Sequence, residues 1–220
     1  MKKVSIEKSP GFPPAAVRPF GTAAIFFSAL SEVETEALRK SIHFLIALVP
    51  AIAAFNHRIV ILLLVSGITA YTVMELLRLC DVKVPIVSAL TGMASRPRDN
   101  GRFVLGPVTL GLGALLALLL FPLPAASIGI YTLAFGDGFA SLTGKLYGRC
   151  RPAFLFGKSV EGSIACFSAV FISAWLASRS PGLSLATAFT ATAVEALPLE
   201  DYDNIALPLA VGFVVQLVLR

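Results

Sequence analysis

Charged side chains are scarce in this chain, and their scarcity excludes an ordinary soluble domain. Of the 220 residues, 14% are charged and 56% are hydrophobic, whereas soluble domains average about 25% charged and about 45–50% apolar residues. The mean hydropathy is +0.83. We therefore expect an integral membrane protein, whose unit of organisation is the apolar span of about 20 residues needed to cross the hydrocarbon layer.

Cysteine is also rare, and the three cysteines are widely spaced, at Cys80, Cys150 and Cys166. Without a CxxC pair, the sequence predicts neither a disulfide framework nor a cysteine zinc site. The first 14 residues have no apolar core directly after their lysines, so we expect no cleavable signal peptide. The net charge of +5 comes without a nucleic-acid recognition motif. In so apolar a chain, basic residues mark cytoplasmic loops and anionic lipid headgroups, so the expected partner is the bilayer and not nucleic acid.

The apolar segments predict an all-α fold, a polytopic membrane helical bundle with about seven transmembrane helices. Residues 1–37 are expected to form a cytoplasmic tail with an interfacial helix at 20–30, because that apolar segment is too short to span. Residues 38–220 are expected to form the transmembrane catalytic domain. The predicted spans are 41–55, 59–77, 103–121, 125–144, 161–178, 184–198 and 204–219.

Basic residues are distributed unequally over the two sides of this arrangement. Fifteen of the eighteen Lys and Arg residues fall on the side of the N-terminus, which the positive-inside rule assigns to the cytoplasm. We therefore expect a bacterial-type cytoplasmic membrane protein with a cytoplasmic N-terminus and active site and a C-terminus outside.

The stretch from Gly136 to Gly162 contains more polar chemistry than membrane spanning requires. Asp137 follows a long apolar run, where an ionised carboxylate is costly unless it is paired, bound to a cation or hydrated. The small residues around it are equally typical of close helix packing, but an acid within the same pattern favours a functional role. These small residues recur at every fourth position: Gly136, Ala140, Gly144 and Gly148.

The segment GKSVEG, Gly157–Gly162, ends as a Walker A motif does, but it is not a P-loop. That motif requires a glycine five residues before Gly157, and position 152 is proline. We expect instead that Ser159 begins a helix whose backbone N–H groups form an anion site together with Lys158. The alternative is that Lys158 only reaches lipid headgroups, which the nearby acid Glu161 makes a poorer explanation.

An acidic turn precedes the last predicted span and contains Glu195, Asp203 and Asn204. One interpretation is a helix cap, with Asp203 or Asn204 as the N-cap residue. The other is a magnesium site, because Mg²⁺ binds one or two carboxylates and completes its shell with water and phosphate oxygens. Upstream, Glu75 and Arg78 have the spacing of a local ion pair. His43, one turn after Arg39 and Lys40, fits either a hydrogen-bonded structural group or a participant in the site.

Together these residues resemble the CTP-dependent lipid-alcohol kinases, namely dolichol kinase, phytol and farnesol kinases and CTP-dependent diacylglycerol kinase. The resemblance covers roughly residues 38–216 and rests mainly on GDGFASLTGKLYGR and GKSVEG. It implies a polytopic helical enzyme that transfers the γ-phosphate of CTP to the hydroxyl of a membrane lipid alcohol, with Mg²⁺ as cofactor. The acceptor is left open among a polyprenol, a phytol-type isoprenoid and diacylglycerol, and the oligomeric state is left open as well.

The resemblance implies by position that the nucleotide and metal site contains Asp137, Lys158, Ser159, Glu161, Asp203 and Asn204. The individual roles are our inference. We expect catalytic roles for Asp137, Lys158 and Glu161, and metal ligation by Asp137, Glu195 and Asp203. The expected nucleotide-binding residues are Gly136, Gly144, Gly148, Lys158, Ser159, Gly162, Asn204, Arg39, Lys40 and His43.

Two other functions compete with this interpretation. The same block resembles, more distantly, phosphatidate cytidylyltransferases, which make CDP-diacylglycerol from CTP and phosphatidic acid. Those enzymes carry a long acidic stretch and a Pro-Gly-His-Gly-Gly segment near the C-terminus, which this chain lacks. A transporter would be expected to show inverted repeats with matching broken helices, and residues 41–121 and 125–219 do not mirror each other in their polar positions.

Overall fold

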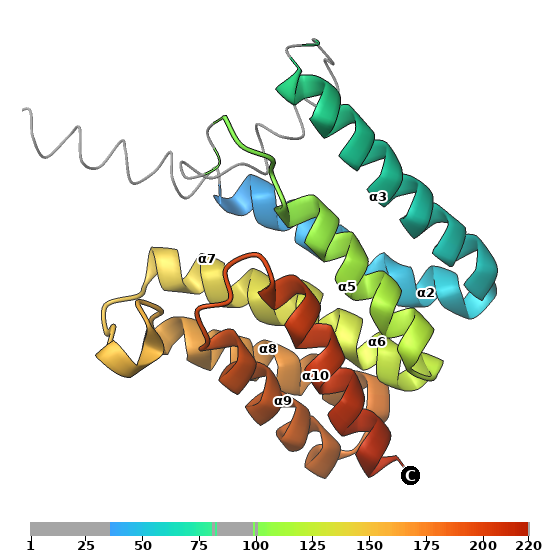
Figure 1. The fold of residues 1–220 in the computed structure, drawn as a ribbon. Coiled ribbons are helices and arrows are strands. Elements are labelled where there is room, and N and C mark those ends of the chain that lie inside the picture. Colours follow the sequence, from blue (N-terminus) through green and yellow to red (C-terminus); the bar gives the residue numbers. More distant parts are fainter. Residues whose placement is uncertain (1–35, 81, 83–98, 100, 220) are drawn as a thin grey trace, which may run out of the picture.

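The computed structural model describes residues 36–80, 82, 99 and 101–219. The predicted interfacial helix at 20–30 and nearly all of the predicted tail lie outside these residues. Within the described part, every regular element is a helix (Figure 1). A helical segment at 36–45 leads through a turn into α2 (Leu48–Phe55). The other elements are α3 (His57–Leu79), α5 (Gly106–Leu120), α6 (Leu123–Tyr131), η2 (Thr132–Asp137), α7 (Gly138–Leu146), η3 (Ala153–Leu155), α8 (Val160–Ser178), α9 (Pro181–Glu195) and α10 (Asp203–Val218).

The predicted all-α membrane bundle is confirmed for the described residues. Three helices are long and apolar enough to cross a membrane, at Glu36–Phe55, His57–Leu79 and Val160–Ser178. Helices α5 and α10 are shorter but also apolar. Each predicted span corresponds to one helical rod in the structure, and the bounds agree to within a few residues because long apolar runs are the strongest signal that a membrane sequence carries.

The fourth predicted span contains a feature that the sequence did not predict. Helices α6 and α7 form one rod, but the residues between them, Thr132–Asp137, adopt a π-helix. Asp137 is the last residue of this segment and is buried. A π-turn adds one residue to the helical repeat and is frequent at functional sites, so it changes the direction in which the following side chains point.

Two apolar clusters form the core. One joins α6, α7, α8, α9 and α10, and the other joins α2, α3, α5 and α6. Glycine permits the close approach of α10 to two of its neighbours. A Cβ at Gly113 would lie 1.9 Å from the backbone oxygen of Asn204, and one at Gly129 would lie 2.6 Å from that of Pro208. These two contacts fix the first half of α10 against α5 and α6.

Helix α3 lies at the edge of the bundle, beside α5 and α2 (Figure 1). Its last turns are attached to the beginning of α5 by buried polar groups. Glu75 accepts two hydrogen bonds from Arg78, both at 2.8 Å, which confirms the predicted ion pair. Glu75 Oε1 also accepts from the backbone N–H of Val104 at 3.0 Å, and the Tyr71 hydroxyl donates to the Val104 oxygen at 3.2 Å.

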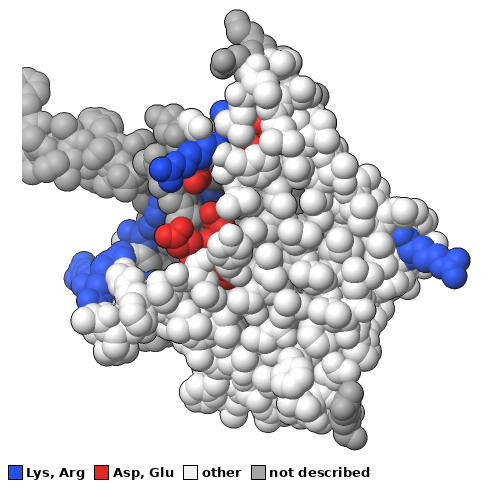
Figure 2. Space-filling model, in the orientation of Figure 1, with Lys and Arg blue, Asp and Glu red and all other residues white. Residues whose placement is uncertain are grey.

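Several helices are too short to cross a bilayer completely. Helices α5, α9 and α10 have 15, 15 and 16 residues, or about 23 Å at 1.5 Å per residue, against a hydrocarbon layer of about 30 Å. The ends that carry Gly106, Glu195 and Asp203 meet at one end of the bundle. Figure 2 shows acidic and basic side chains gathered in a hollow at this end, while the rest of that face is almost free of charge.

Candidate active site

The hollow contains a large cavity, here called the charged cavity. Its empty volume, including the part open to solvent, is about 760 Å³. Acids, bases and small residues from five parts of the chain line it. They include Glu36, Arg39, Lys40, Asp137, Ser141, Gly144, Lys145, Arg151, Lys158, Ser159, Gly162, Glu195, Glu200 and Asp203.

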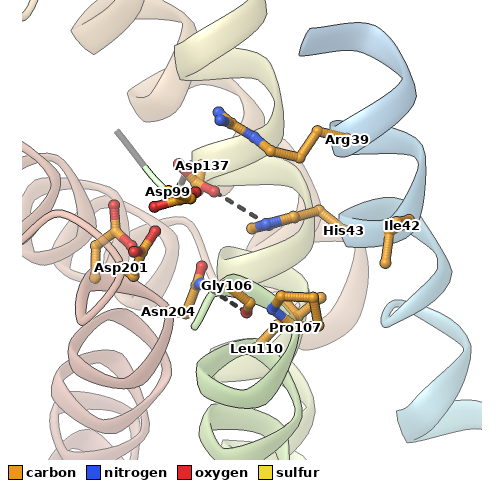
Figure 3. Close-up of a pocket in the computed structure, with 11 residues that line it drawn as sticks. Arg39, Ile42, His43, Asp99, Gly106, Pro107, Leu110, Asp137, Asp201 and Asn204 are labelled. Carbon is orange, nitrogen blue, oxygen red and sulfur yellow. Dashed lines mark hydrogen bonds and ion pairs between the residues drawn. The ribbon is translucent and has the colours of Figure 1, made fainter. Parts of the chain in front are cut away.

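A second pocket, here called the inner pocket, adjoins the charged cavity (Figure 3). Its empty volume, including the part open to solvent, is about 450 Å³, and it shares Arg39, Asp137 and Asp203 with the cavity. One side is polar and the other is apolar. The polar residues are Arg39, His43, Asp99, Asp137, Asp201, Asp203 and Asn204, and the others are Ile42, Gly106, Pro107 and Leu110.

Asp137 is held by two side chains from the helical segment 36–45. The Lys40 ammonium forms an ion pair with Oδ2 of Asp137, and His43 Nδ1 lies 3.1 Å from the same oxygen. The exposed fractions of the Lys40 and Asp137 side chains are 2% and 10%. This arrangement, here called the inner pair, supplies the compensation that an acid between apolar helices requires. It joins residues 97 positions apart.

Lys158 and Glu195 form a second pair, here called the outer pair, on the other side of the charged cavity. Lys158 Nζ lies 2.9 Å from Glu195 Oε1 and also donates to the Glu195 backbone oxygen. The Lys158 side chain is 29% exposed, so its ammonium reaches the cavity. Glu195 Oε2 is buried and has no hydrogen-bond partner among the described residues. A buried acceptor without a partner is costly and indicates a place for a missing donor or cation.

Ser159 begins α8, as the sequence predicted. Its hydroxyl accepts the backbone N–H of Gly162 at 3.1 Å, which is the geometry of an N-cap. Lys158 therefore directly precedes the N-terminus of a 19-residue helix, where backbone N–H groups favour an anion. Within the described residues, helix α7 and the short η3 turn precede this site, and no strand does, which agrees with the exclusion of a P-loop.

The predicted nucleotide-binding glycines serve close packing. A Cβ at Gly148 would lie 2.1 Å from the Gly144 backbone oxygen, and one at Gly162 would lie 2.8 Å from that of Ala140. A Cβ at Gly136 would lie 2.8 Å from the Val170 side chain. Gly144 and Gly162 also line the charged cavity, whereas Gly136 and Gly148 do not. The small residues thus bring α7 and α8 together, which is the packing interpretation of the sequence pattern.

Glu161 lies beside the cavity and is not among the residues that line it. Its carboxylate accepts the backbone N–H groups of Arg149 at 3.0 Å and Cys150 at 3.2 Å. Arg151 stabilises the same connection by donating to the backbone oxygens of Gly157 at 2.6 Å and Gly144 at 2.9 Å. Glu161 therefore orders the loop between α7 and α8 that presents Lys158. Its predicted catalytic role stays a prediction.

The capping interpretation of the acidic turn is wrong. Helix α10 begins at Asp203, its N-cap residue is Tyr202, and no side chain caps it. Asn204 donates instead across the bundle to Thr109 Oγ1, at 3.0 Å, and its own Oδ1 is buried with no partner in the described part of the chain. Asp203 lines both the charged cavity and the inner pocket. The beginning of α10 is therefore held by tertiary contacts, and its polar groups face the site.

The three predicted metal ligands, Asp137, Glu195 and Asp203, all line the charged cavity. Among the described residues, however, no group of three or more His, Cys, Asp or Glu side chains is arranged to hold a metal ion. The packing places Asp137 with Lys40 and Glu195 with Lys158. Buried acceptor oxygens without partners are present at Glu195 and Asn204, and oxygen atoms are the ligands that Mg²⁺ takes.

Sequence reasoning missed a third charged cluster at the rim of the cavity. Glu36 is buried, forms an ion pair with Arg39, and lies 2.8 Å from Lys145 Nζ of α7. The spacing of Glu36 and Arg39, three residues apart, was a signal for the local pair. The contact with Lys145 had no such signal, because it depends on how the helical segment 36–45 packs beside α7.

Comparison with known proteins finds similarity to plant lipid kinases. The chain is 30% identical to a "Probable phytol kinase, chloroplastic" of Triticum aestivum, over 56% of this chain and 47% of that protein. It is 29% identical to "Probable phytol kinase 1, chloroplastic" of Oryza sativa subsp. japonica and to "Probable phytol kinase, chloroplastic" of Zea mays, over 56% of this chain in each case and 45% and 46% of those proteins. The chain thus spans about half the length of the curated relatives it matches. No family model and no solved structure matches it. The resemblance to lipid-alcohol kinases that the sequence motifs indicated is confirmed by these relatives.

Proposed function

We propose that this protein is a membrane lipid kinase that transfers the γ-phosphate of CTP to the hydroxyl of a lipid alcohol. The observation that carries the proposal is the convergence, around one cavity, of a buried acid, an exposed lysine and a helix N-terminus. Phosphoryl transfer depends on positioning and on neutralising phosphate charge, and these groups can do both. The similarity to proteins named as phytol kinases supports the same reaction class.

The nucleotide phosphates would bind on the α8 side of the charged cavity. Lys158 supplies a positive charge, and the first backbone N–H groups of α8 supply directed donors. Arg39, Lys145 and Arg151 also line the cavity and increase its positive charge. A triphosphate bound here would break the contact between Lys158 and Glu195 and take the ammonium for itself. Glu195 would then be left with two oxygens for another cationic partner.

The residues present fit a magnesium ion bound together with the nucleotide. In kinases Mg²⁺ is held by one or two carboxylates, with phosphate oxygens and water completing its shell. Glu195 and Asp203 line the cavity, and Glu195 Oε2 and Asn204 Oδ1 are buried oxygens without partners. The ion would neutralise charge that develops on the transferred phosphoryl group. These residues, more than the Lys40-bound Asp137, are therefore our proposed ligands.

Asp137 and His43 would act on the acceptor. In the transfer, the lipid hydroxyl oxygen forms the bond to the γ-phosphorus, the bond from that phosphorus to the bridging oxygen breaks, and CDP leaves. The hydroxyl proton must pass to a base. We propose Asp137 as that base, because it lines both the charged cavity and the inner pocket and its Oδ2 lies 3.1 Å from His43 Nδ1.

The test is a reaction of the purified protein with γ-labelled CTP and Mg²⁺ in lipid–detergent micelles. The acceptors are phytol, farnesol, a polyprenol and diacylglycerol, each assayed separately. The expected product is a labelled lipid monophosphate that disappears when EDTA removes the metal. Label that appears only in pyrophosphate, with phosphatidic acid as the required lipid, would overturn the proposal in favour of a cytidylyltransferase. Label in neither product would refute a CTP-dependent enzyme altogether, and a parallel series with γ-labelled ATP tests the choice of nucleotide.

A further inference from the structure

A third pocket lies between the helical segment 36–55, α3 and α5, and it is apolar. Its empty volume, including the part open to its surroundings, is about 710 Å³. Ile42 and Leu45 line it from the first helix, Leu63 and Gly67 from α3, and Pro107 and Leu110 from α5. This apolar groove is separate from the charged cavity and has no residue in common with it.

The apolar groove adjoins the inner pocket. The two share Ile42, Pro107 and Leu110. Ile42 is adjacent in sequence to His43, and the inner pocket contains both His43 and Asp137 (Figure 3). A molecule that filled the groove would therefore have one end beside the Asp137 carboxylate. Asp137 also lines the charged cavity.

The groove is open to the surroundings of the bundle, and the helices beside it are connected beyond each end. At one end α2 turns into α3 at Asn56, and at the other Tyr71 and Glu75 are hydrogen-bonded to Val104. Between them, Leu45 and Leu63 line the groove with side chains that are 63% and 57% exposed. In a bilayer these side chains contact acyl chains, so an apolar molecule can enter sideways without crossing water.

We propose that the apolar groove binds the hydrocarbon chain of the acceptor and places its hydroxyl beside Asp137 and His43. This inference rests on the proposed function and adds to it the location of the acceptor. From Leu63 to Tyr71 the lining face of α3 is about 12 Å long, so it contacts a chain along several bonds. The residues of α3 therefore determine which acceptor chain lengths bind, while the nucleotide phosphates are bound at α8.

Gly67 allows the groove to be filled selectively. A Cβ at Gly67 would meet no atom within 4 Å, and glycine is unfavourable inside a helix, so Gly67→Phe places a ring in the groove without a clash in the backbone. The matched control is Gly182→Phe in α9, where a Cβ also meets no atom within 4 Å and which lines none of the three pockets. Gly67→Leu provides a smaller filling of the same space.

The experiment measures KM for lipid alcohols of increasing chain length in the γ-labelled CTP assay. For Gly67→Phe we expect KM for long acceptors to rise by about tenfold or more, with KM for CTP unchanged and the shortest acceptor nearly unaffected. Gly67→Leu should give a smaller rise, and Gly182→Phe should behave as the wild type. If KM of Gly67→Phe equals that of the wild type for acceptors of every chain length, the groove is not the acceptor site. If the wild type phosphorylates no lipid alcohol, the proposed function fails first.

Photo-crosslinking provides a readout that does not depend on turnover. A lipid alcohol with a photoreactive group near the end of its chain is expected to label peptides from α3, and Gly67→Phe should reduce that labelling. Labelling confined to α8 and α9, unchanged by Gly67→Phe, would overturn the proposal even if the kinase is active.

Discussion

The inner and outer lysine–carboxylate pairs look alike in composition and differ in burial. Lys40 is 2% exposed, whereas Lys158 is 29% exposed. The buried ammonium of Lys40 cannot exchange its carboxylate partner for a phosphate unless the helices around it separate. The partly exposed ammonium of Lys158 can. The inner pair therefore holds Asp137 in place, and the outer pair is the one that a nucleotide can open. The same two residue types thus serve positioning in one place and ligand binding in the other.

The largest effect is expected from breaking the inner pair at its acid. Asp137→Asn should lower kcat/KM by about 10³-fold, because general bases contribute about 10²- to 10⁴-fold. It also leaves the Lys40 charge buried without compensation, which typically costs about 3–5 kcal/mol. The measurements are kinase activity and the midpoint of thermal unfolding in detergent.

The double variant Lys40→Met with Asp137→Asn separates these two effects. It removes both charges, so the unfolding midpoint should return most of the way to the wild-type value while activity stays lost. If activity recovered together with stability, Asp137 would contribute only to folding. It would then have no role in the chemical step.

Breaking the outer pair should affect nucleotide binding and leave folding intact. Lys158→Ala should reduce kcat/KM for CTP by about 10²-fold, the cost of removing one preorganised charged donor, with an unfolding midpoint close to the wild type because the lysine head is partly exposed. Lys145→Ala, at the 43%-exposed rim lysine, is the matched control and should cost less. A Lys158→Ala protein that fails to fold would identify the outer pair as a second structural pair.

The loop that presents Lys158 can be loosened without touching the pair. Glu161→Ala removes the acceptor for the backbone N–H groups of Arg149 and Cys150, and we expect about a tenfold loss of kcat/KM, comparable to one hydrogen bond to a charged group. Glu161→Gln keeps an acceptor oxygen and should recover most of the activity. Equal losses in both variants would instead support the catalytic role predicted from the sequence.

The smallest effect on activity is expected from the packing glycines. Gly148→Ala places a Cβ 2.1 Å from the Gly144 oxygen, and overpacking of this kind costs about 1–3 kcal/mol. Thermal unfolding should report the loss, while kcat/KM of the folded fraction stays near the wild type. Gly182→Ala has open space and should be neutral. A Gly148→Ala protein that is stable but cannot use CTP would restore the nucleotide-binding role predicted for this glycine.

Most of the helix positions could be predicted because they depend on local composition. His57–Leu79 and Val160–Ser178 agree closely with the predicted spans 59–77 and 161–178, since an apolar run of sufficient length has few alternatives in a bilayer. The N-cap at Ser159 was also predictable, because it too depends on local sequence. The π-helix ending at Asp137 was not, because no residue type encodes it and it forms only within a packed rod.

The site could be predicted as a set of residues and not as pairs. Lys40, Asp137, Lys158 and Glu195 were all identified, but the sequence contains no signal that Lys40 meets Asp137 or that Lys158 meets Glu195. These pairs join residues 97 and 37 positions apart. Of the two interpretations of the acidic turn, the helix cap at Asp203 or Asn204 was wrong, because the contact of Gly113 with Asn204 holds that helix end through tertiary packing.

By itself the sequence determined that the chain is an all-helical membrane protein, where its helices run, and which polar residues stand out against an apolar background. It did so because burial in lipid requires long apolar helices and makes each charge costly. The apolar runs and the few charged residues are therefore both visible in the sequence. Only the tertiary structure decided which charges neutralise each other, which carboxylate oxygen is left without a partner, and that an apolar groove meets the inner pocket at Ile42, Pro107 and Leu110. Those features depend on the distances between helices far apart in the chain, which composition does not encode.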